Sequence, residues 1–192
     1  MTVKEYQNYC KDKLETIYQE VKIEWNPFGR RDDQYSPKPD IAVGPFATAD
    51  RRGENYDRLL EKPKSKAFIK SLIEKNNENI MTFGDGVISS WSDIFQFNYN
   101  ARCFICVEIE NEVSRKHIIG GLVNASALGR IAVLIAWTPE KLRAFIKLKN
   151  YLKFLSSVEK NSFKTANILI LSKDQFRGLV DSAANMPMRR IR

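Results

Sequence analysis

Residues 102–137 read RCFICVEIENEVSRKHIIGGLVNASALGRIAVLIAW, and this stretch decides the fold. Two apolar runs, 104–109 and 131–137, are rich in β-branched residues and are typical of buried strands. Residues 114–128 between them have helical spacing. A strand, a helix and a second strand in this order predict a βαβ unit, whose strands are parallel neighbours in a covered sheet.

Acidic side chains gather where the first of these strands ends, at Glu108, Glu110 and Glu112. Because side chains alternate along a strand, Glu108 and Glu110 share one face with Cys106. Two neighbouring carboxylates at the end of a buried strand are costly unless a positive group lies between them. The pattern therefore predicts a divalent metal site.

The composition is that of an ordinary soluble globule. The 192 residues suit one domain with a sizeable core. A net charge of +8 favours an anionic partner, either nucleic acid or a membrane surface, although the protein could also be merely basic. No apolar run reaches the length of a membrane-spanning helix, and the polar N-terminus does not fit a signal peptide. Three cysteines suggest reduced thiols, so we expect a cytoplasmic protein without membrane partners.

Two elements near the N-terminus carry further acids. Helical spacing predicts an amphipathic helix over residues 3–21, capped by Thr2 and Glu5, with Glu20 near the edge of its apolar stripe. A short strand is predicted over residues 40–43, directly after Pro39. Taken alone, Asp40 at the start of that strand would more often be a turn-capping residue.

Residues 46–100 are strongly basic and are predicted to form an insertion packed on the sheet. Pro63 can begin a helix that the polar residues 76–79 end. This excess of positive charge favours contacts with phosphates. The alternative is that these side chains simply form a solvent-exposed face. The predicted nucleic-acid-binding residues are Arg51, Arg52, Arg58, Lys64, Lys66 and Lys70. A capped helix after Thr138, a strand over 167–171 and a helix after Ser172 complete the chain.

Several chemistries lack their motifs. There is one histidine, His117, and no G-x-S-x-G, so a Ser-His-Asp hydrolase has no support. No Walker A or G-x-G-x-x-G sequence predicts a nucleotide cofactor. Cys103 and Cys106 have C-x-x-C spacing within a strand, which favours core thiols over a zinc site. The adjacent glycines at 120 and 121 favour close helix–sheet packing over phosphate binding.

The acids that remain resemble the motif of the PD-(D/E)XK nuclease superfamily, which has the restriction-endonuclease-like fold. Pro39-Asp40 matches the first half of the motif, and Glu108-Ile109-Glu110 matches the second, with glutamate where lysine is usual. The order of elements over residues 1–45 and 100–137 is also similar to that family. The resemblance implies an α/β domain with a central mixed β-sheet flanked by helices. Its core would be residues 1–45 and 100–185, and residues 46–100 would be an insertion between the two motif strands.

The resemblance further implies a Mg²⁺-dependent DNA endonuclease that hydrolyses phosphodiester bonds, for example a type II restriction enzyme acting as a homodimer. Asp40, Glu108 and Glu20 would hold Mg²⁺, with Mn²⁺ as a substitute. Glu110 would orient water or add a metal ligand, and Lys116 or Lys38 would supply the missing positive charge. Two alternatives stay open. One is a catalytically inactive nuclease-fold protein that binds nucleic acid or serves in assembly, and the other is an α/β domain whose acids merely end a strand.

Overall fold

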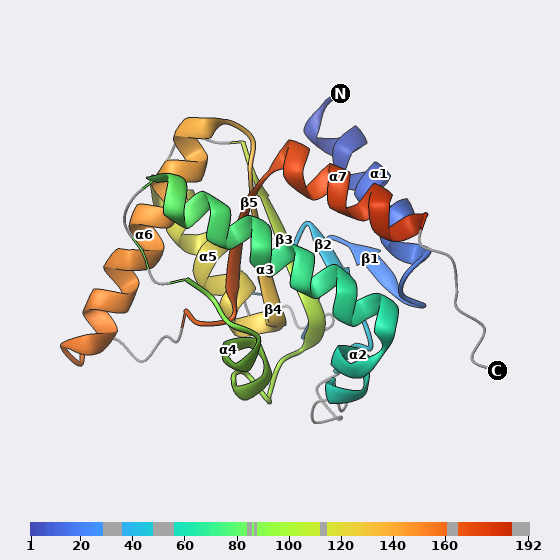
Figure 1. The fold of residues 1–192 in the computed structure, drawn as a ribbon, viewed down its shortest axis with the longest axis horizontal. Helices are drawn as coiled ribbons and strands as arrows, with labels where there is room; N and C mark the ends of the chain where they lie inside the picture. The colour runs from blue at the N-terminus through green and yellow to red at the C-terminus, as the bar shows by residue number, and fades with distance from the viewer. Residues whose placement is uncertain are drawn as a thin grey trace.

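A mixed β-sheet forms the centre of the fold, with helices on both of its faces (Figure 1). The computed structural model describes residues 1–28, 36–47, 56–83, 86, 88–111, 115–160 and 165–185, without the side chains of residues 96, 115 and 116. In spatial order the strands are β1 (Val21–Ile23), β2 (Ile41–Val43), β3 (Cys103–Glu110), β4 (Gly129–Ala136) and β5 (Ile168–Ser172). The first three are antiparallel neighbours, and β3, β4 and β5 are parallel. The predicted α/β class with a mixed, helix-flanked sheet is confirmed.

The predicted βαβ unit is present as β3, α5 (Arg115–Leu128) and β4. Both strands are buried almost throughout because helices cover both faces of the sheet. Gly129 begins β4 at a place where the chains approach closely. A Cβ atom there would lie 2.7 Å from the Cβ atom of Cys106 and would also clash with the carbonyl oxygen of Ile131, so a larger residue would force β3 and β4 apart.

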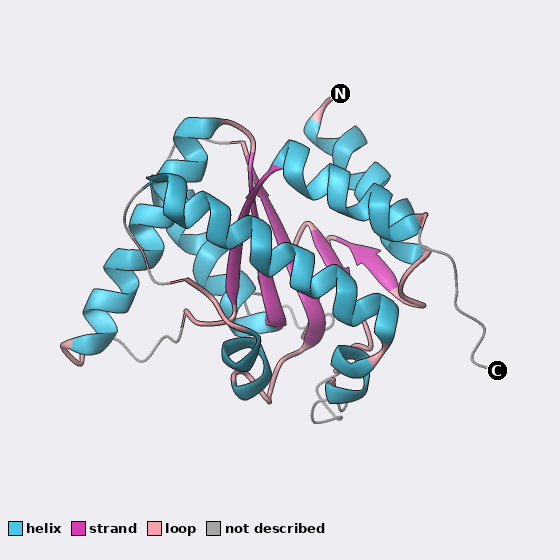
Figure 2. Cartoon of the chain, in the orientation of Figure 1, coloured by secondary structure: helices cyan, strands magenta, loops and turns pink. Residues whose placement is uncertain are grey.

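The helices divide between the two faces of the sheet, as Figure 2 shows for α3 crossing in front of the strands. One face is covered by α1 (Val3–Glu15), α2 (Asp57–Glu61), α3 (Pro63–Phe83) and α7 (Lys173–Ala184). The opposite face is covered by α5 and α6 (Pro139–Ser157). The short α4 (Trp91–Gln96) precedes β3. Ile105, Val107 and Ile109 face α1, α3 and α7, whereas Cys106 faces α5 and α6.

The first helix is shorter than predicted. It begins with the expected capping box at Thr2 but ends at Glu15, with Thr16 as its C-cap. The helical spacing of apolar residues continues beyond this point, but residues 21–23 pair with β2 instead. Val21 lies opposite Val43, so these residues gain sheet hydrogen bonds that a longer helix would forfeit. The prediction of a helix over 3–21 is therefore wrong after residue 15, and Glu20 lies outside any helix.

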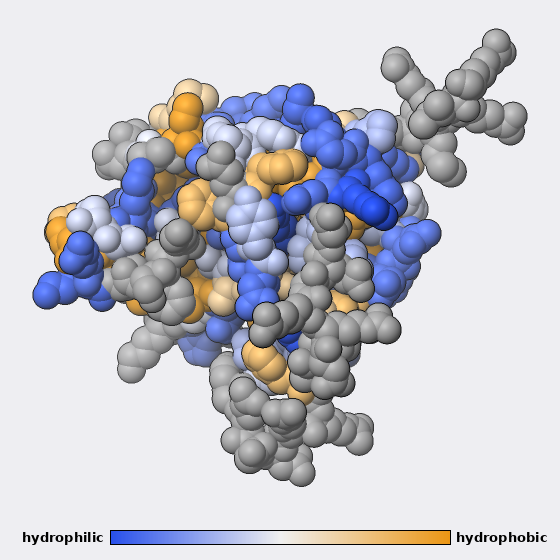
Figure 3. Space-filling model, turned by 90° about the horizontal axis from the view of Figure 1, so that it is seen from below, coloured by the Kyte–Doolittle hydropathy of each residue, from blue (hydrophilic) through white to orange (hydrophobic). Residues whose placement is uncertain are grey.

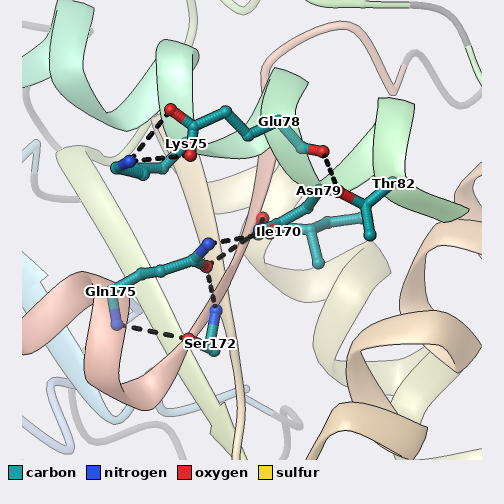
Figure 4. A network of polar contacts seen from close by, with 7 residues as sticks. All are labelled: Lys75, Glu78, Asn79, Thr82, Ile170, Ser172 and Gln175. Carbon is teal, nitrogen blue, oxygen red and sulfur yellow. Dashed lines mark hydrogen bonds and ion pairs between the residues drawn. The ribbon is translucent and has the colours of Figure 1, made fainter.

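The long helix α3 continues through the polar residues that were expected to end it. Asn76 Oδ1 accepts a 2.9 Å hydrogen bond from the backbone N–H of Ile170, and Asn79 Nδ2 donates a 2.9 Å bond to the carbonyl of the same residue. Gln175 Nε2 donates to Asn79 Oδ1, and its Oε1 accepts from Ser172 N, which joins α3 to the start of α7 (Figure 4). Because β5 is an edge strand, these amides satisfy backbone groups that would otherwise lack a partner.

The basic region between β2 and β3 is part of the main core. Phe68, Ile69 and Leu72 of α3 belong to the same buried cluster as Ile105 and Val107 of β3. The region is also bonded to the buried Arg130 of β4, which donates to the carbonyls of Phe95 and Phe97 and to Asp57 Oδ1. These contacts tie α2 and α4 to the sheet.

The three cysteines are buried and form no disulfide. Burial raises the pKa of the Cys106 thiol well above its ordinary value, which fits an inert core residue. Across the residues that the structure describes, the helices are too short or too polar to cross a lipid bilayer.

Candidate active site

Asp40 is held in place at three points just before β2. Its Oδ2 atom accepts a 2.6 Å hydrogen bond from the backbone N–H of Ile109 in β3. Its carbonyl oxygen accepts from Nε2 of the buried Gln7 in α1 at 2.6 Å and from the N–H of Glu24, just after β1, at 3.4 Å. The position of this carboxylate is therefore set by α1, by β1 and by the end of β3.

Asp40 and Glu108 lie across from each other on one face of the sheet. The antiparallel register pairs Ile41 with Val107, and continuing it by one residue places Asp40 opposite Glu108. Directly opposed residues of antiparallel strands have Cβ atoms about 4.5–5.5 Å apart. Alternation along β3 puts Glu110 on the same face, and this face is the one that α5 and α6 cover.

The carboxylates of Asp40, Glu108 and Glu110 repel one another in a partly buried environment. The pKa of Glu108 is raised well above its usual range, chiefly by burial and further by the negative charges of Asp40 and Glu110. The pKa of Asp40 is also raised by burial, against the lowering effect of the Ile109 hydrogen bond, and Glu24 and Glu110 raise it further. A cation among these groups would relieve both the repulsion and the loss of hydration.

A pocket of about 340 Å³ opens beside these acids. Glu108, Ile109 and Glu110 line it at the sheet. The other walls include Lys38 before β2, Phe145 of α6 and four residues of α5, namely His117, Gly120, Gly121 and Asn124. Lys38 and His117 are exposed, so the pocket can be reached from solvent.

The two glycines of α5 were expected to allow close helix–sheet packing, but a Cβ atom would fit at both positions. A Cβ atom on Gly121 would lie 3.8 Å from the Cβ of Glu108, so the helix backbone passes directly over this acid. A Cβ atom on Gly120 would meet nothing within 4 Å, since it would point into open space. The helix therefore approaches the sheet through Gly121.

The structure brings together most of the acids that the sequence singles out, but not all of them. Asp40, Glu108 and Glu110 share one site, and Lys38 lines it. Glu20 is exposed, and its carbonyl accepts from Gly44 N at the far end of β2. That position is four residues from Asp40, or roughly 13 Å along a strand.

The predicted basic residues fall into two groups. Arg51 and Arg52 lie outside the described residues. Arg58 lies on α2, and Lys64, Lys66 and Lys70 lie on α3, which covers the face of the sheet opposite to the acids. Lys64 donates to the carbonyl of Thr16, and Lys66 forms an ion pair with Glu61. The structure therefore does not bring these lysines to the candidate site.

Lys116 belongs to the first turn of α5, and its side chain lies outside the described part of the chain. Further basic residues on the same side of the sheet as the site belong to α6, which contributes Phe145 to the pocket. Lys141 and Lys147 are the clearest examples, and neither is buried.

Four residues near the site escaped the sequence-based prediction. His117 and Asn124 follow the spacing i and i+7, with the two glycines between them at i+3 and i+4, so helical periodicity does place them on one face. Glu24 replaces Glu20 as the acid beside Asp40, because residues 21–23 form a strand. Gln7 gives no signal in the sequence, since its role is a single hydrogen bond to a distant backbone carbonyl.

Comparisons with models of known protein families, with curated proteins and with solved structures found no match for this chain.

Proposed function

We propose that this protein is a Mg²⁺-dependent DNA endonuclease with a restriction-endonuclease-like core. The observation that carries the proposal is the placement of Asp40 opposite Glu108, with Glu110 on the same face beside a pocket that also contains a lysine. The order of helix, antiparallel strands, acid-bearing strand, helix and parallel strand also supports it. Glu110 stands where the motif usually has lysine.

The acids present fit magnesium better than a metal that needs a complete set of protein ligands. Within the described ranges, no three His, Cys, Asp or Glu side chains form a group that could hold an ion by themselves. Mg²⁺ keeps several waters and needs only one or two carboxylates together with substrate phosphates. Asp40 and Glu108 would supply these, and Mn²⁺ would serve with the same oxygen ligands. The pKa of each of these two carboxyls is raised chiefly by burial and further by neighbouring carboxylates, and a bound dication would offset both effects.

The bound metal would lower the pKa of a water and stabilise charge on the scissile phosphate. The chain's own residues would position the reactants. The Ile109 N–H holds one oxygen of Asp40 and leaves its Oδ1 atom for a ligand. Glu110 would orient the attacking water. Lys38 would place a positive charge near the phosphate, which is the task of the lysine that the motif lacks.

The DNA backbone would contact basic side chains on the α6 face, among them Lys141 and Lys147. A duplex could be cut on both strands if two copies paired their sites across a two-fold axis, so a homodimer is part of the proposal. We infer a cytoplasmic location, in keeping with the three free cysteines.

Cleavage of supercoiled and linear DNA with Mg²⁺ or Mn²⁺ tests this proposal. Wild type should cut, and Glu108→Ala should be inactive. Glu20→Ala is the matched control, since this exposed acid lies at the other end of the strand pair and its loss should leave cleavage unchanged. Equal cutting by wild type and Glu108→Ala would indicate a contaminating nuclease and would remove the support for this site.

A second function keeps the fold without the chemistry. Glutamate at the motif lysine position favours it, because an inactive protein that binds nucleic acid or serves in assembly would have no need of that lysine. Such a protein would bind DNA, and neither Mg²⁺ nor Mn²⁺ would bring about cleavage. Calorimetric titration of Mg²⁺ into wild type and Glu108→Ala would then show whether the site still binds metal. Binding by wild type alone would indicate an intact metal site, and binding by neither would indicate that the site has been lost.

A further inference from the structure

A second cavity lies near the start of the edge strand β5, away from Asp40 and Glu108. It has a volume of about 480 Å³, which is in the range of small-molecule sites. Its walls come from the second half of α6, from α4 and the residues on either side of it, and from residues 165–166 before β5. Figure 3 views the molecule from below, and orange hydrophobic groups lie beside blue hydrophilic ones on the surface that it shows.

A buried amine forms part of the cavity wall. Lys149 Nζ donates to the carbonyl of Ile168 at 2.7 Å and to Ser89 Oγ at 3.3 Å. A charged amine has three protons to donate. Among the residues that the structure describes, no acceptor takes the third proton of Lys149, although this residue is buried.

A hydroxyl donor lies next to this amine. Ser89 Oγ accepts from Lys149 Nζ and also from Asn76 Nδ2 at 3.2 Å, so its own proton must point elsewhere. No described residue accepts that proton. Ser89 is held firmly, because its N–H donates to Asn77 Oδ1 at 2.8 Å and its carbonyl accepts from Asn77 Nδ2 at 2.9 Å. Two fixed donors therefore meet on the wall of the cavity, and each has a proton to offer.

The charged groups around the amine leave a small positive excess. Lys153 and Asp93 also line the cavity, so among the described residues its ionisable side chains are two bases and one acid. Asp93 Oδ2 already accepts from the backbone N–H and the hydroxyl of Ser90, which caps α4. Burial lowers the pKa of Lys149 to about 8, with Asp93 raising it and Lys153 lowering it further. The amine is still mostly protonated at neutral pH.

We propose that this cavity binds a small organic carboxylate with an apolar body. The carboxylate oxygens would accept the remaining protons of Lys149 Nζ and Ser89 Oγ, and the apolar part would contact Ile88, Phe97 and Ala166. One net positive charge and two donors suit a monoanion better than a phosphate dianion. This inference does not depend on the proposed nuclease activity, because the site uses none of the same residues.

Calorimetry with simple probes tests the proposal on the full chain without DNA or metal. Benzoate and hexanoate should bind, and benzyl alcohol, which has a similar shape but no charge, should bind at least about tenfold more weakly. Benzoate affinity should fall by up to about tenfold per pH unit above about pH 8, as Lys149 loses its proton. Lys149→Met should abolish the preference for the carboxylate, whereas Lys153→Met, which removes an exposed lysine from the same helix, should have a smaller effect.

Ser89→Ala provides a second variant if Lys149→Met does not fold, and it should weaken benzoate while leaving benzyl alcohol unchanged. The wild-type pH profile gives a result that needs no variant. Equal affinity for benzoate and benzyl alcohol, a flat profile from about pH 7 to about pH 9.5, or no saturable binding of either carboxylate would each overturn the proposal.

Discussion

The backbone N–H of Ile109 donates a 2.6 Å hydrogen bond to Oδ2 of Asp40, although the two residues are 69 positions apart in the sequence. This bond fixes the carboxylate against the end of β3. It also accounts for the shared site, because Glu108 and Glu110 flank Ile109 on the same strand. The arrangement therefore concentrates the negative charge of three carboxylates at the end of β3.

We expect Asp40→Asn to lower metal-dependent DNA cleavage by at least about 10²-fold while leaving the fold intact. The amide keeps the shape of the side chain and an oxygen that can accept from Ile109 N–H, but it cannot bind a dication as strongly. Single-turnover cleavage and circular dichroism would measure the two properties. Loss of the folded spectrum would mean instead that the Asp40 charge is structural.

Glu108→Gln should stabilise the metal-free protein at neutral pH. The folded-state pKa of Glu108 is raised, so the folded protein holds a proton that the unfolded chain releases, and stability falls as pH rises from about 4.3 towards the folded pKa. Removing the charge should therefore raise the free energy of unfolding and the Tm at neutral pH. Thermal unfolding in a chelator from acid to neutral pH would show it, with Glu20→Gln as the control. An unchanged pH slope in Glu108→Gln would contradict the assignment.

Lys38→Met should slow cleavage by about 10²-fold. Lys38 would supply the positive charge that the motif's lysine usually provides and that Glu110 cannot. Lys70→Met removes an exposed lysine from the opposite face of the sheet and should have no effect. Adding Glu110→Lys to Lys38→Met should restore part of the rate by returning a lysine to the usual position. If Lys38→Met cleaves DNA as fast as wild type, Lys38 does not have this role.

DNA affinity should fall steeply with salt, and the α6 face should account for the slope. Replacing Lys141 and Lys147 by Gln should reduce the slope of log K against log salt by about 1 for each lost phosphate contact. The matched replacement of Lys66 and Lys70 on α3 should leave it unchanged, since these residues lie over the other face of the sheet. Fluorescence anisotropy with a short duplex would measure both. The reverse result would place the DNA on the α3 face.

Gly120→Ala and Gly121→Ala should each stabilise α5 by about 0.5–1 kcal/mol, because both positions are helical and neither has a close neighbour. Only at position 121 would the new methyl group touch Glu108, at an ordinary contact distance of 3.8 Å. Denaturant unfolding would measure the stabilities. A loss of stability in Gly121→Ala alone would show that the helix cannot accept even this contact with the sheet.

The local patterns of the sequence predicted much of the architecture. Apolar runs and helical spacing over residues 102–137 indicated β3, α5 and β4, and cap residues located the starts of α1, α6 and α7. Alternation along β3 also placed Glu108 and Glu110 on one face. These predictions depend on spacing within a few residues, which the chain geometry converts directly into a face.

The sequence did not reveal where local patterns compete with long-range pairing. Residues 16–21 continue a helical pattern, yet the pairing of residues 21–23 with β2 ends α1 early and brings Glu24 rather than Glu20 to Asp40. Asn76 and Asn79 look like helix-ending residues, yet they bond an edge strand 91–94 positions away. Only the tertiary structure decides such cases, because the partner that satisfies a polar group can come from any part of the chain.

By itself, then, the sequence determined the βαβ unit, the acids at the end of β3 and the basic character of the chain. The tertiary structure decided that Asp40 lies opposite Glu108, that the lysines of α3 lie away from these acids, and that Lys149 is buried beside a second cavity. The physical reason is that periodicity and capping are local properties of the chain, whereas burial and strand register depend on contacts between distant segments.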